Sequence, residues 1–224
     1  MTDSRPTAER ILDAAEALFA RHGYQGTSMG DIAARVGVRP PSLYNHFRGK
    51  EALYGAVLER LMAHFQPLIG QAVQGSATDR ESALRWARSM AETYFDHPNF
   101  ARLLQHAALA PTPHARALLT EFLRPLFEPA ASGMHLPPPL QPWGAMDFNN
   151  LLISYITLAP LYRPLLDIDP LSPEARERQV EMVLELVDSA LTRRPAGNVA
   201  NTTNAAGIPS TPSSHAPRPS RRRA

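Results

Sequence analysis

Residues 26–47, which read GTSMGDIAARVGVRPPSLYNHF, decide the fold of this chain. Ser28 and Asp31 have the spacing of a helix capping box, with aspartate in the place of the more usual glutamate. From Met29 to Val36 the apolar side chains recur at helical spacing, which predicts a helix with one buried face. Gly37 follows directly and is suited to a tight break in the chain.

A short third helix is expected from Ser42 to about Phe47. Pro40 and Pro41 precede it and can occupy a first helical turn, where a missing backbone N–H costs nothing. Leu43 and Phe47 are four residues apart and supply an inward anchor, while the other side chains are polar or amphipathic. Helix, glycine-containing turn and short helix together have the spacing of a helix–turn–helix.

The flanking sequence is also helical. Thr7 to Arg21 predicts a first helix, and Gly23 behind it can take the left-handed conformation of a C-cap. A long fourth helix is expected from about Lys50. Five later segments have helical patterns, and no segment alternates like a strand: Asp79–Phe95, Pro98–Leu109, His114–Arg124, Asp147–Leu158 and Pro173–Arg193.

Prolines are frequent in the middle of the chain and in its last thirty residues. Pro125, Pro129 and the 137–139 run predict breaks, with a loop from Ser132 to Pro142. Residues 195–224 are rich in Pro, Ser, Thr and Asn and predict a disordered tail. Its three final arginines either add nonspecific DNA affinity or form a solvated terminus.

Composition narrows the class of protein. The 224 residues are 44% hydrophobic, contain no cysteine and carry a formal net charge of only +2. No apolar run approaches the roughly 18 residues of a membrane span, and the N-terminus lacks a secretory signal, so we expect a cytoplasmic protein without membrane contact. Any nucleic-acid binding must come from a local arrangement of residues.

In a helix–turn–helix, the second helix enters the major groove and flanking groups hold phosphates. The alternative is that residues 28–47 form only a three-helix packing unit, since many bundles contain such a turn. Four stretches favour the first interpretation because they closely resemble the DNA-binding domain of the tetracycline-repressor (TetR) family: residues 26–33, 37–38, 42–47 and 50–53, together with ILDAAEALFARHGYQGTS before them. The resemblance runs from about Arg10 to Val57.

This resemblance implies an all-α protein with three parts. Residues 1–49 would be the helix–turn–helix DNA-binding domain, residues 50–194 a helical ligand-binding and dimerisation domain, and residues 195–224 the tail. It also implies DNA contacts position by position. Those expected to hold the DNA backbone are Thr27 or Ser28, Tyr44, His46 and Lys50, and those expected to read bases are Arg39, Pro40, Pro41, Ser42 and Asn45.

Two of these contacts have alternatives. Tyr44 contributes mainly packing if it is half buried, and Arg39 contacts only phosphate if its guanidinium does not reach guanine. Asn45 is suited to pair with adenine.

A small effector is expected between the helices of the second domain. Its candidate contacts are the large side chains of this region together with two polar ones: Trp86, Met90, Tyr94, Phe95, Arg102, Leu103, His106, Phe122, Trp143, Met146, Phe148 and Tyr155. Each of the apolar ones can equally be plain core. Arg102 and His106 can orient an anionic or hydrogen-bonding ligand, or serve as surface or satisfied core groups.

The resemblance places a homodimer interface on the last two helices. An apolar stripe there either forms that interface or packs inward, and consists of Val180, Val183, Leu184, Val187 and Leu191. Because one short recognition helix reads few bases, the mechanism calls for a two-fold dimer on double-stranded operator DNA. Ligand binding would change the separation of the two recognition helices through the fourth helix.

The function expected is therefore a sequence-specific transcriptional regulator, favoured as a repressor that a ligand releases. The alternatives are an activator or a ligand-independent regulator of the same fold. An enzyme is not expected, because the histidines and acids show no metal-ligand spacing or Ser/His/Asp pattern and no glycine-rich phosphate loop is present. We expect neither a cofactor nor a metal. A protein-binding module built on the same fold remains a further alternative.

Overall fold

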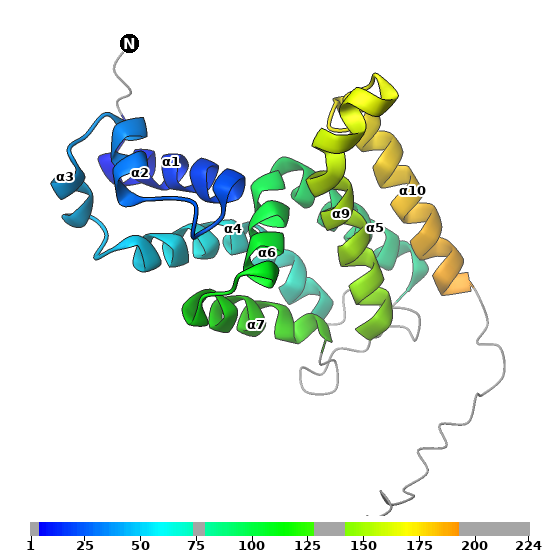
Figure 1. Ribbon diagram of the computed structural model, residues 1–224. Coiled ribbons are helices and arrows are strands. Elements are labelled where there is room, and N and C mark those ends of the chain that lie inside the picture. The colour runs from blue at the N-terminus through cyan, green and yellow to red at the C-terminus, as the bar shows by residue number, and fades with distance from the viewer. Residues whose placement is uncertain (1–4, 74–78, 128–141, 193–224) are drawn as a thin grey trace, which may run out of the picture. The chain divides into compact units, whose positions relative to one another are not determined.

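The computed structural model describes residues 5–73, 79–127 and 142–192, and every regular element in these ranges is an α-helix (Figure 1). The predicted all-α class is confirmed, with a helix–turn–helix unit followed by a larger set of helices. The side chains of residues 73, 126, 127, 142 and 143 are not described. The Trp143 side chain, the expected loop up to residue 141 and the expected tail from residue 195 thus lie outside the described residues.

Three helices form the N-terminal part: α1 (Thr7–His22), α2 (Met29–Val36) and α3 (Pro40–Tyr44). Ile11, Ala15 and Phe19 of α1 are fully buried, which confirms the predicted inner face. This face packs against α2 and against α4 (Lys50–Val73).

Gly23 ends α1 with a φ of 70° and a ψ of 176°. The φ is in the region that favours glycine, but the extended ψ is not left-handed helical, so the expected C-cap conformation is not the one adopted. A Cβ at this position would lie 3.0 Å from His106 Nδ1, so the tight approach of that side chain also favours glycine.

The third helix ends earlier than expected. Pro40 is already in its first turn, and the regular helix ends at Tyr44, not at Phe47. The amides of His46 and Phe47 still donate to the Leu43 carbonyl, at 3.0 and 2.9 Å, and close one further turn. The apolar pattern through Phe47 was thus produced by a helix plus a turn.

Helix α4 buries one side along its whole length. Leu53, Val57 and Leu61 are all buried, as predicted, and Phe65 and Ile69 continue the same row. This row contacts α1 near its start and three later helices further along: α5 (Arg80–Asp96), α6 (Pro98–Leu109) and α7 (Pro113–Phe127). The expected segments for α5 and α6 match within a residue at each end.

Three helices in the described ranges contain internal prolines, and one of these prolines, Pro125, was predicted as a break. Helix α7 continues past Pro125, and α9 (Pro142–Leu166) contains Pro160 and Pro164 and is longer than the expected segment at both ends. Each internal proline costs a backbone hydrogen bond. Burial of Leu152, Ile156 and Ala159 against the core offsets this cost up to Pro160.

The last helix, α10 (Pro173–Thr192), packs mainly on α5. Val180, Val183 and Val187 are buried, and Leu184 and Leu191 are partly buried against the core. Of the two alternatives for this stripe, the structure therefore shows inward packing. No helix in the described ranges is long and apolar enough to cross a membrane.

Candidate nucleic-acid interface and internal pocket

The start of α2 is fixed by the predicted capping box. The Asp31 amide donates to Ser28 Oγ at 3.1 Å, and the Ser28 amide donates to Asp31 Oδ2 at 2.9 Å. Hydrogen bonds from the side chain and backbone of Ser28 hold the pKa of Asp31 below its usual value. The direction of α2 is thus set by two local pairs.

The turn into α3 is equally local. Gly37 has a left-handed conformation (φ 77°, ψ 34°), and its N–H donates to the Ala33 carbonyl at 3.0 Å. Arg10 of α1 donates to the Val36 carbonyl at 2.7 Å, which ties the end of α2 to the first helix. Leu43 is fully buried and Phe47 is partly buried, so both predicted anchors of α3 face the core.

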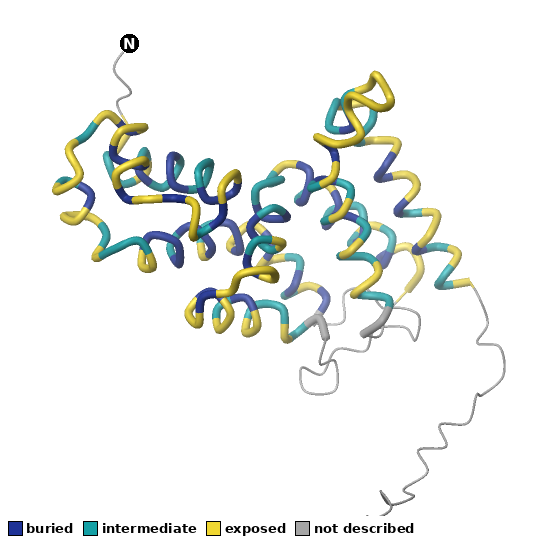
Figure 2. The backbone as a smooth tube through the Cα atoms, viewed as in Figure 1, coloured by how far each residue is buried: buried dark blue, intermediate teal, exposed yellow. Residues whose placement is uncertain are grey.

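The opposite face of α3 is open to solvent. Arg39, Pro40 and Pro41 at its start are exposed, and so are Asn45 and His46 at its end. Figure 2 shows this exposed segment at the far end of the N-terminal helices. Residues 37–49 contain no acidic side chain, so this face carries positive charge from arginine without a carboxylate in the same stretch.

Tyr44 and Ser42 complete this surface. Tyr44 is 55% exposed, so of its two expected roles packing is the smaller in this structure. Ser42 is half-buried. The exposed face of residues 39–46 therefore contains most of the side chains expected to contact DNA.

The remaining three expected contacts have additional partners in the protein. Thr27 is buried, and its hydroxyl donates to the Gly23 carbonyl at 3.0 Å, whereas Ser28 is exposed. Lys50 Nζ donates to the carbonyls of Tyr24 and Thr27, at 2.9 and 3.0 Å, and lies 4.2 Å from the Tyr24 ring centroid. An ammonium has three N–H donors, so one remains for an external group.

Aromatic packing supports the loop that Lys50 holds. Tyr54 of α4 meets Phe19 edge-on at 4.9 Å between ring centroids and lies 5.2 Å from the Tyr24 ring. Burial raises the pKa of Tyr54 to about 12, so this phenol stays neutral. The helix–turn–helix is thus fixed to α4 by an aromatic cluster beneath the loop.

A second feature is a small apolar cavity enclosed by α4, α5, α6, α7 and α9. Its volume is about 30 Å³, which is the share of about one water molecule in the liquid. Five predicted residues line it, namely Trp86, Met90, Tyr94, Phe122 and Phe148. The lining that the sequence reasoning missed consists of Phe65, Ile69, Ala72, Phe100, Leu123, Gly144, Ala145 and Asn149.

Two polar side chains in this lining already have partners. The Tyr94 hydroxyl donates to Asn149 Oδ1 at 2.6 Å, and Trp86 Nε1 donates to the Leu68 carbonyl at 2.8 Å. Burial raises the pKa of Tyr94, so its hydroxyl remains a neutral donor. The cavity is therefore apolar with one central hydrogen-bonded pair.

The other predicted ligand contacts lie elsewhere. Phe95 and Leu103 are buried core, Met146 is 42% exposed, and the Tyr155 hydroxyl donates to the Pro170 carbonyl at 2.9 Å. Arg102 and His106 face a different cleft, bordered by α1 and α9. No group of three or more His, Cys, Asp or Glu side chains in the described ranges is placed to hold a metal ion.

Comparison with known proteins identifies the N-terminal unit. Residues 11–57 match the family described as bacterial regulatory proteins, tetR family. The N-terminal unit is thus similar to that of TetR-family regulators. The match covers α1, α2, α3 and the start of α4, which are the elements that carry the exposed face of residues 39–46.

Individual transcriptional regulators are also similar to part of this chain. The HTH-type transcriptional repressor ComR of Escherichia coli is 44% identical over 57 residues, 25% of this chain and 27% of ComR. The HTH-type transcriptional activator FasR of Mycolicibacterium smegmatis is 39% identical over 87 residues, 39% of this chain and 38% of FasR. The chain thus matches 27% of the length of one of these relatives and 38% of the other.

The remainder of the fold is similar to that of solved structures. A putative transcriptional regulator from Streptomyces coelicolor is 26% identical, has a TM-score of 0.54 and covers 81% of this chain and 98% of its own. The likeness thus extends over the later helices as well as the helix–turn–helix.

Proposed function

We propose that this chain is a dimeric transcriptional regulator that binds double-stranded operator DNA through α3 and the residues on either side of it. The observation that carries the proposal is the solvent-exposed, acid-free face of residues 39–46 on a helix anchored by the buried Leu43. A helix presented in this way fits the major groove, with its N-terminal residues toward base edges.

Roles within this face follow from chemistry and exposure. Asn45 presents an amide suited to adenine, and Arg39 a planar fork suited to guanine or to phosphate. Ser28, His46 and the remaining Lys50 donor are suited to phosphates. Thr27 is assigned support of the loop, because its hydroxyl is already engaged with the Gly23 carbonyl.

Dimer formation is proposed through the outer faces of α9 and α10. Apart from Tyr44 and Leu109, the exposed large apolar side chains in the described ranges gather on α9, the turn after it and α10: Met146, Leu158, Leu161, Tyr162, Leu165, Leu166, Ile168, Met182 and Leu186. Figure 2 shows the exposed end of α9 and its turn. Clustered apolar exposure of this kind marks an interaction surface.

A small apolar effector is proposed for the cavity around Tyr94. The lining favours a hydrophobic molecule, and the Tyr94–Asn149 pair offers one donor and one acceptor for a neutral polar group. Because the cavity volume is about 30 Å³, a larger ligand must displace the surrounding helices. Phe65 and Ile69 carry that displacement into α4, the helix that also fixes the helix–turn–helix.

The direction of regulation is proposed as repression, released when the effector binds. ComR is named a repressor and FasR an activator, so relatives support both directions. Repression follows from the mechanism if the displaced α4 separates the recognition helices from their half-sites.

The experiment is fluorescence anisotropy of purified full-length protein with the intergenic DNA beside its own gene. Scrambled DNA serves as competitor, and Asn45→Ala is compared with Gln66→Ala, an exposed residue of α4 outside the proposed DNA and dimer surfaces. The proposal expects competitor-resistant binding that Asn45→Ala weakens by about ten-fold or more, because one base contact is worth about 1–3 kcal/mol.

Binding to any DNA with equal affinity would leave a nonspecific binder whose operator lies elsewhere. A folded dimer that binds no DNA at low salt, before and after removal of bound ligand by unfolding and refolding, would contradict the proposal. An unchanged affinity in Asn45→Ala with a loss in Gln66→Ala would contradict the assigned face.

A further inference from the structure

A polar cleft lies where the C-terminal part of α1 meets α6 and α9. Its charged lining consists of Arg21 from α1 and Arg102 with His106 from α6, and no acidic side chain lines it. Asn99 and Gln105 add two amides. The cleft is separate from the apolar cavity around Tyr94, since the two share no residue.

The positive charge of this cleft is not neutralised inside the protein. Arg102 is half-buried, and the one hydrogen bond of its guanidinium goes to the neutral Asn99 side chain at 2.8 Å. Burial lowers the pKa of Arg102, which reflects the cost of a charge taken from water without a counter-charge. Arg21 has no ion pair with any residue in the described ranges.

Two carboxylates close in sequence to the cleft residues have other partners. Glu16 of α1 pairs with Arg60 and accepts from Asn99 at 2.9 Å. Asp96, two residues before α6, lies 3.9 Å from Arg176. Neither lines the cleft. The guanidinium of Arg102 thus retains most of its five donors for a group that enters from solvent.

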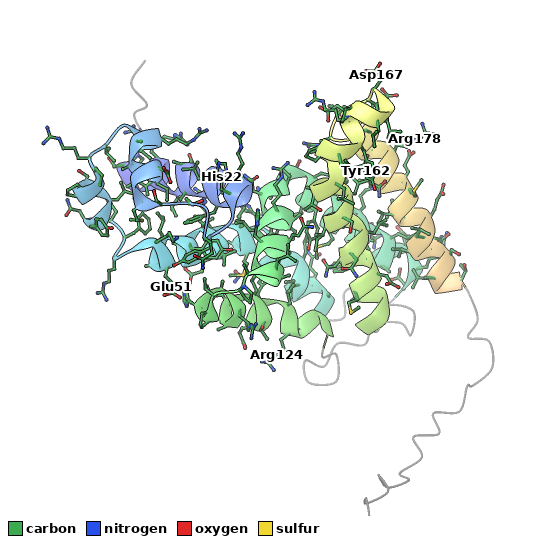
Figure 3. All side chains as sticks on the ribbon, viewed as in Figure 1. His22, Glu51, Arg124, Tyr162, Asp167 and Arg178 are labelled. Carbon is green, nitrogen blue, oxygen red and sulfur yellow. The ribbon has the colours of Figure 1, made fainter. Side chains whose placement is uncertain are left out.

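The position of the cleft separates it from the proposed DNA surface. Figure 3 labels His22, which follows Arg21 at the end of α1 beside α6, whereas α3 lies at the other end of the N-terminal helices. Helices α1 and α6 are in contact. An anion in the cleft would therefore touch the first helix of the DNA-binding unit and a regulatory helix at once.

We propose that this cleft binds a small oxyanion, a phosphate or a dicarboxylate, held between Arg21 of α1 and Arg102 of α6. Guanidinium forks match the oxygens of both groups in bidentate geometry. The His106 ring, packed against the backbone of Gly23, adds a third donor from a fixed position. The bound oxyanion supplies the counter-charge that Arg102 lacks.

The site goes beyond the proposed effector cavity, because its chemistry is charged where that of the cavity is apolar. By joining α1 to α6 it holds the DNA-binding unit in one position relative to the regulatory helices. An anion bound here and an apolar effector around Tyr94 would thus both act on the contact between the DNA-binding unit and the regulatory helices.

The test is isothermal titration calorimetry of the full chain, without DNA, with inorganic phosphate and separately with succinate at constant ionic strength. The cleft variants are Arg102→Gln and Arg21→Gln. The matched control is Arg85→Gln, an exposed arginine of α5 outside the cleft. Arg39→Gln reports phosphate binding on the DNA face.

We expect saturable binding in the unmodified protein, unchanged in the Arg85→Gln and Arg39→Gln variants and about ten-fold or more weaker in both cleft variants. Tighter binding of phosphate or of succinate then assigns the oxyanion. If Arg102→Gln does not fold by circular dichroism, the exposed Arg21→Gln decides. The proposed site is overturned if the unmodified protein does not bind, or if the cleft variants bind as tightly as it does. It is also overturned if binding is lost only in Arg39→Gln.

Discussion

Leu43→Ala tests whether α3 is held in place by a single buried anchor. Leu43 is fully buried, while its helix spans only Pro40–Tyr44. A helix of one turn and a half has little stability of its own, because nucleation is costly and few hydrogen bonds follow. Its position therefore depends on the packing of this side chain together with the partly buried Phe47.

The expected cost is about 2–5 kcal/mol, the range for Leu→Ala in a close-packed core. A loss of about 3 kcal/mol raises the ratio of detached to docked α3 by roughly 140-fold. Because α3 lies at the end of the N-terminal unit and contacts mainly α2, we expect much of this loss as local opening and only part of it as a lower unfolding temperature.

Hydrogen exchange measured by mass spectrometry detects this opening directly. The amides of His46 and Phe47 both donate to the Leu43 carbonyl, so they exchange faster once α3 detaches. Operator affinity should fall in parallel, since only the docked fraction binds. Leu109→Ala is the control, because Leu109 is 80% exposed and its loss should change stability by less than about 0.5 kcal/mol.

The reasoning is refuted if the two amides exchange at the same rate in Leu43→Ala as in the unmodified protein. It is also refuted if the variant loses DNA binding while those amides stay protected, because α3 would then be docked and another change would be responsible.

Three further predictions concern single contacts. Ser28→Ala removes the cap of α2 and should lower the free energy of unfolding by about 0.5–2 kcal/mol in urea denaturation. Tyr94→Phe leaves Asn149 Oδ1 without its donor, and should cost about 1 kcal/mol in the same assay. For Asp13, partial burial raises the pKa, but hydrogen bonds from Arg60 and Arg5 outweigh it and the pKa is lowered from 3.8. The hydrogen bonds of the Asp13 carboxylate to the two arginines should therefore stabilise the fold above pH 3.8. This contribution should be lost as pH falls through the lowered pKa of Asp13 in the folded state.

Each of these has its own control. Ser172→Ala removes a hydroxyl from the α9–α10 turn and should leave α2 exchange unchanged, whereas Ser28→Ala should increase it. Tyr44→Phe, on a 55% exposed residue outside the proposed dimer surface, should be nearly neutral in the absence of DNA; equal costs for the two tyrosines would contradict the Tyr94 prediction. Arg60→Gln should flatten the acid dependence, and an unaltered profile would show that Asp13 does not gain from Arg60.

The helix–turn–helix was predictable because its signals are local. Ser28 and Asp31 form hydrogen bonds to each other, and Pro40 and Pro41 begin α3. Gly37 adopts the left-handed conformation, which glycine takes at no steric cost. None of these depends on distant residues. Only the end of α3 was misplaced, because a turn behind a helix shows the same apolar spacing.

The later helices were less predictable where tertiary packing decides. The expected segment stops at Leu158, yet α9 continues through Pro160 to Leu166. The cavity shows the same limit. Phe65 continues a visible apolar row on α4, but nothing in that row indicates that it meets Asn149 of α9 at a common cavity.

The two polar residues predicted as ligand contacts illustrate the reason. Arg102 and His106 are predicted from their polarity to orient a ligand among the aromatic residues. Helix α6 instead turns Phe100 toward the cavity and Arg102 toward α1. Two residues that are two positions apart on a helix face in different directions. The helices that pack against each face therefore determine which site a residue lines.

The core of this protein crosses from the DNA-binding unit into the later helices without a boundary. Leu53, Val57 and Leu58 of α4 are fully buried in the same cluster as Ile11 of α1 and Val183 of α10. A hybrid regulator is usually designed by joining two domains at the boundary between them. In this chain, a junction before Lys50 would expose the buried cluster in both fragments. A workable exchange must transplant α1 to α4 together and rebuild the complementary surfaces of α6 and α7, so the proposed operator and effector preferences would be inherited jointly.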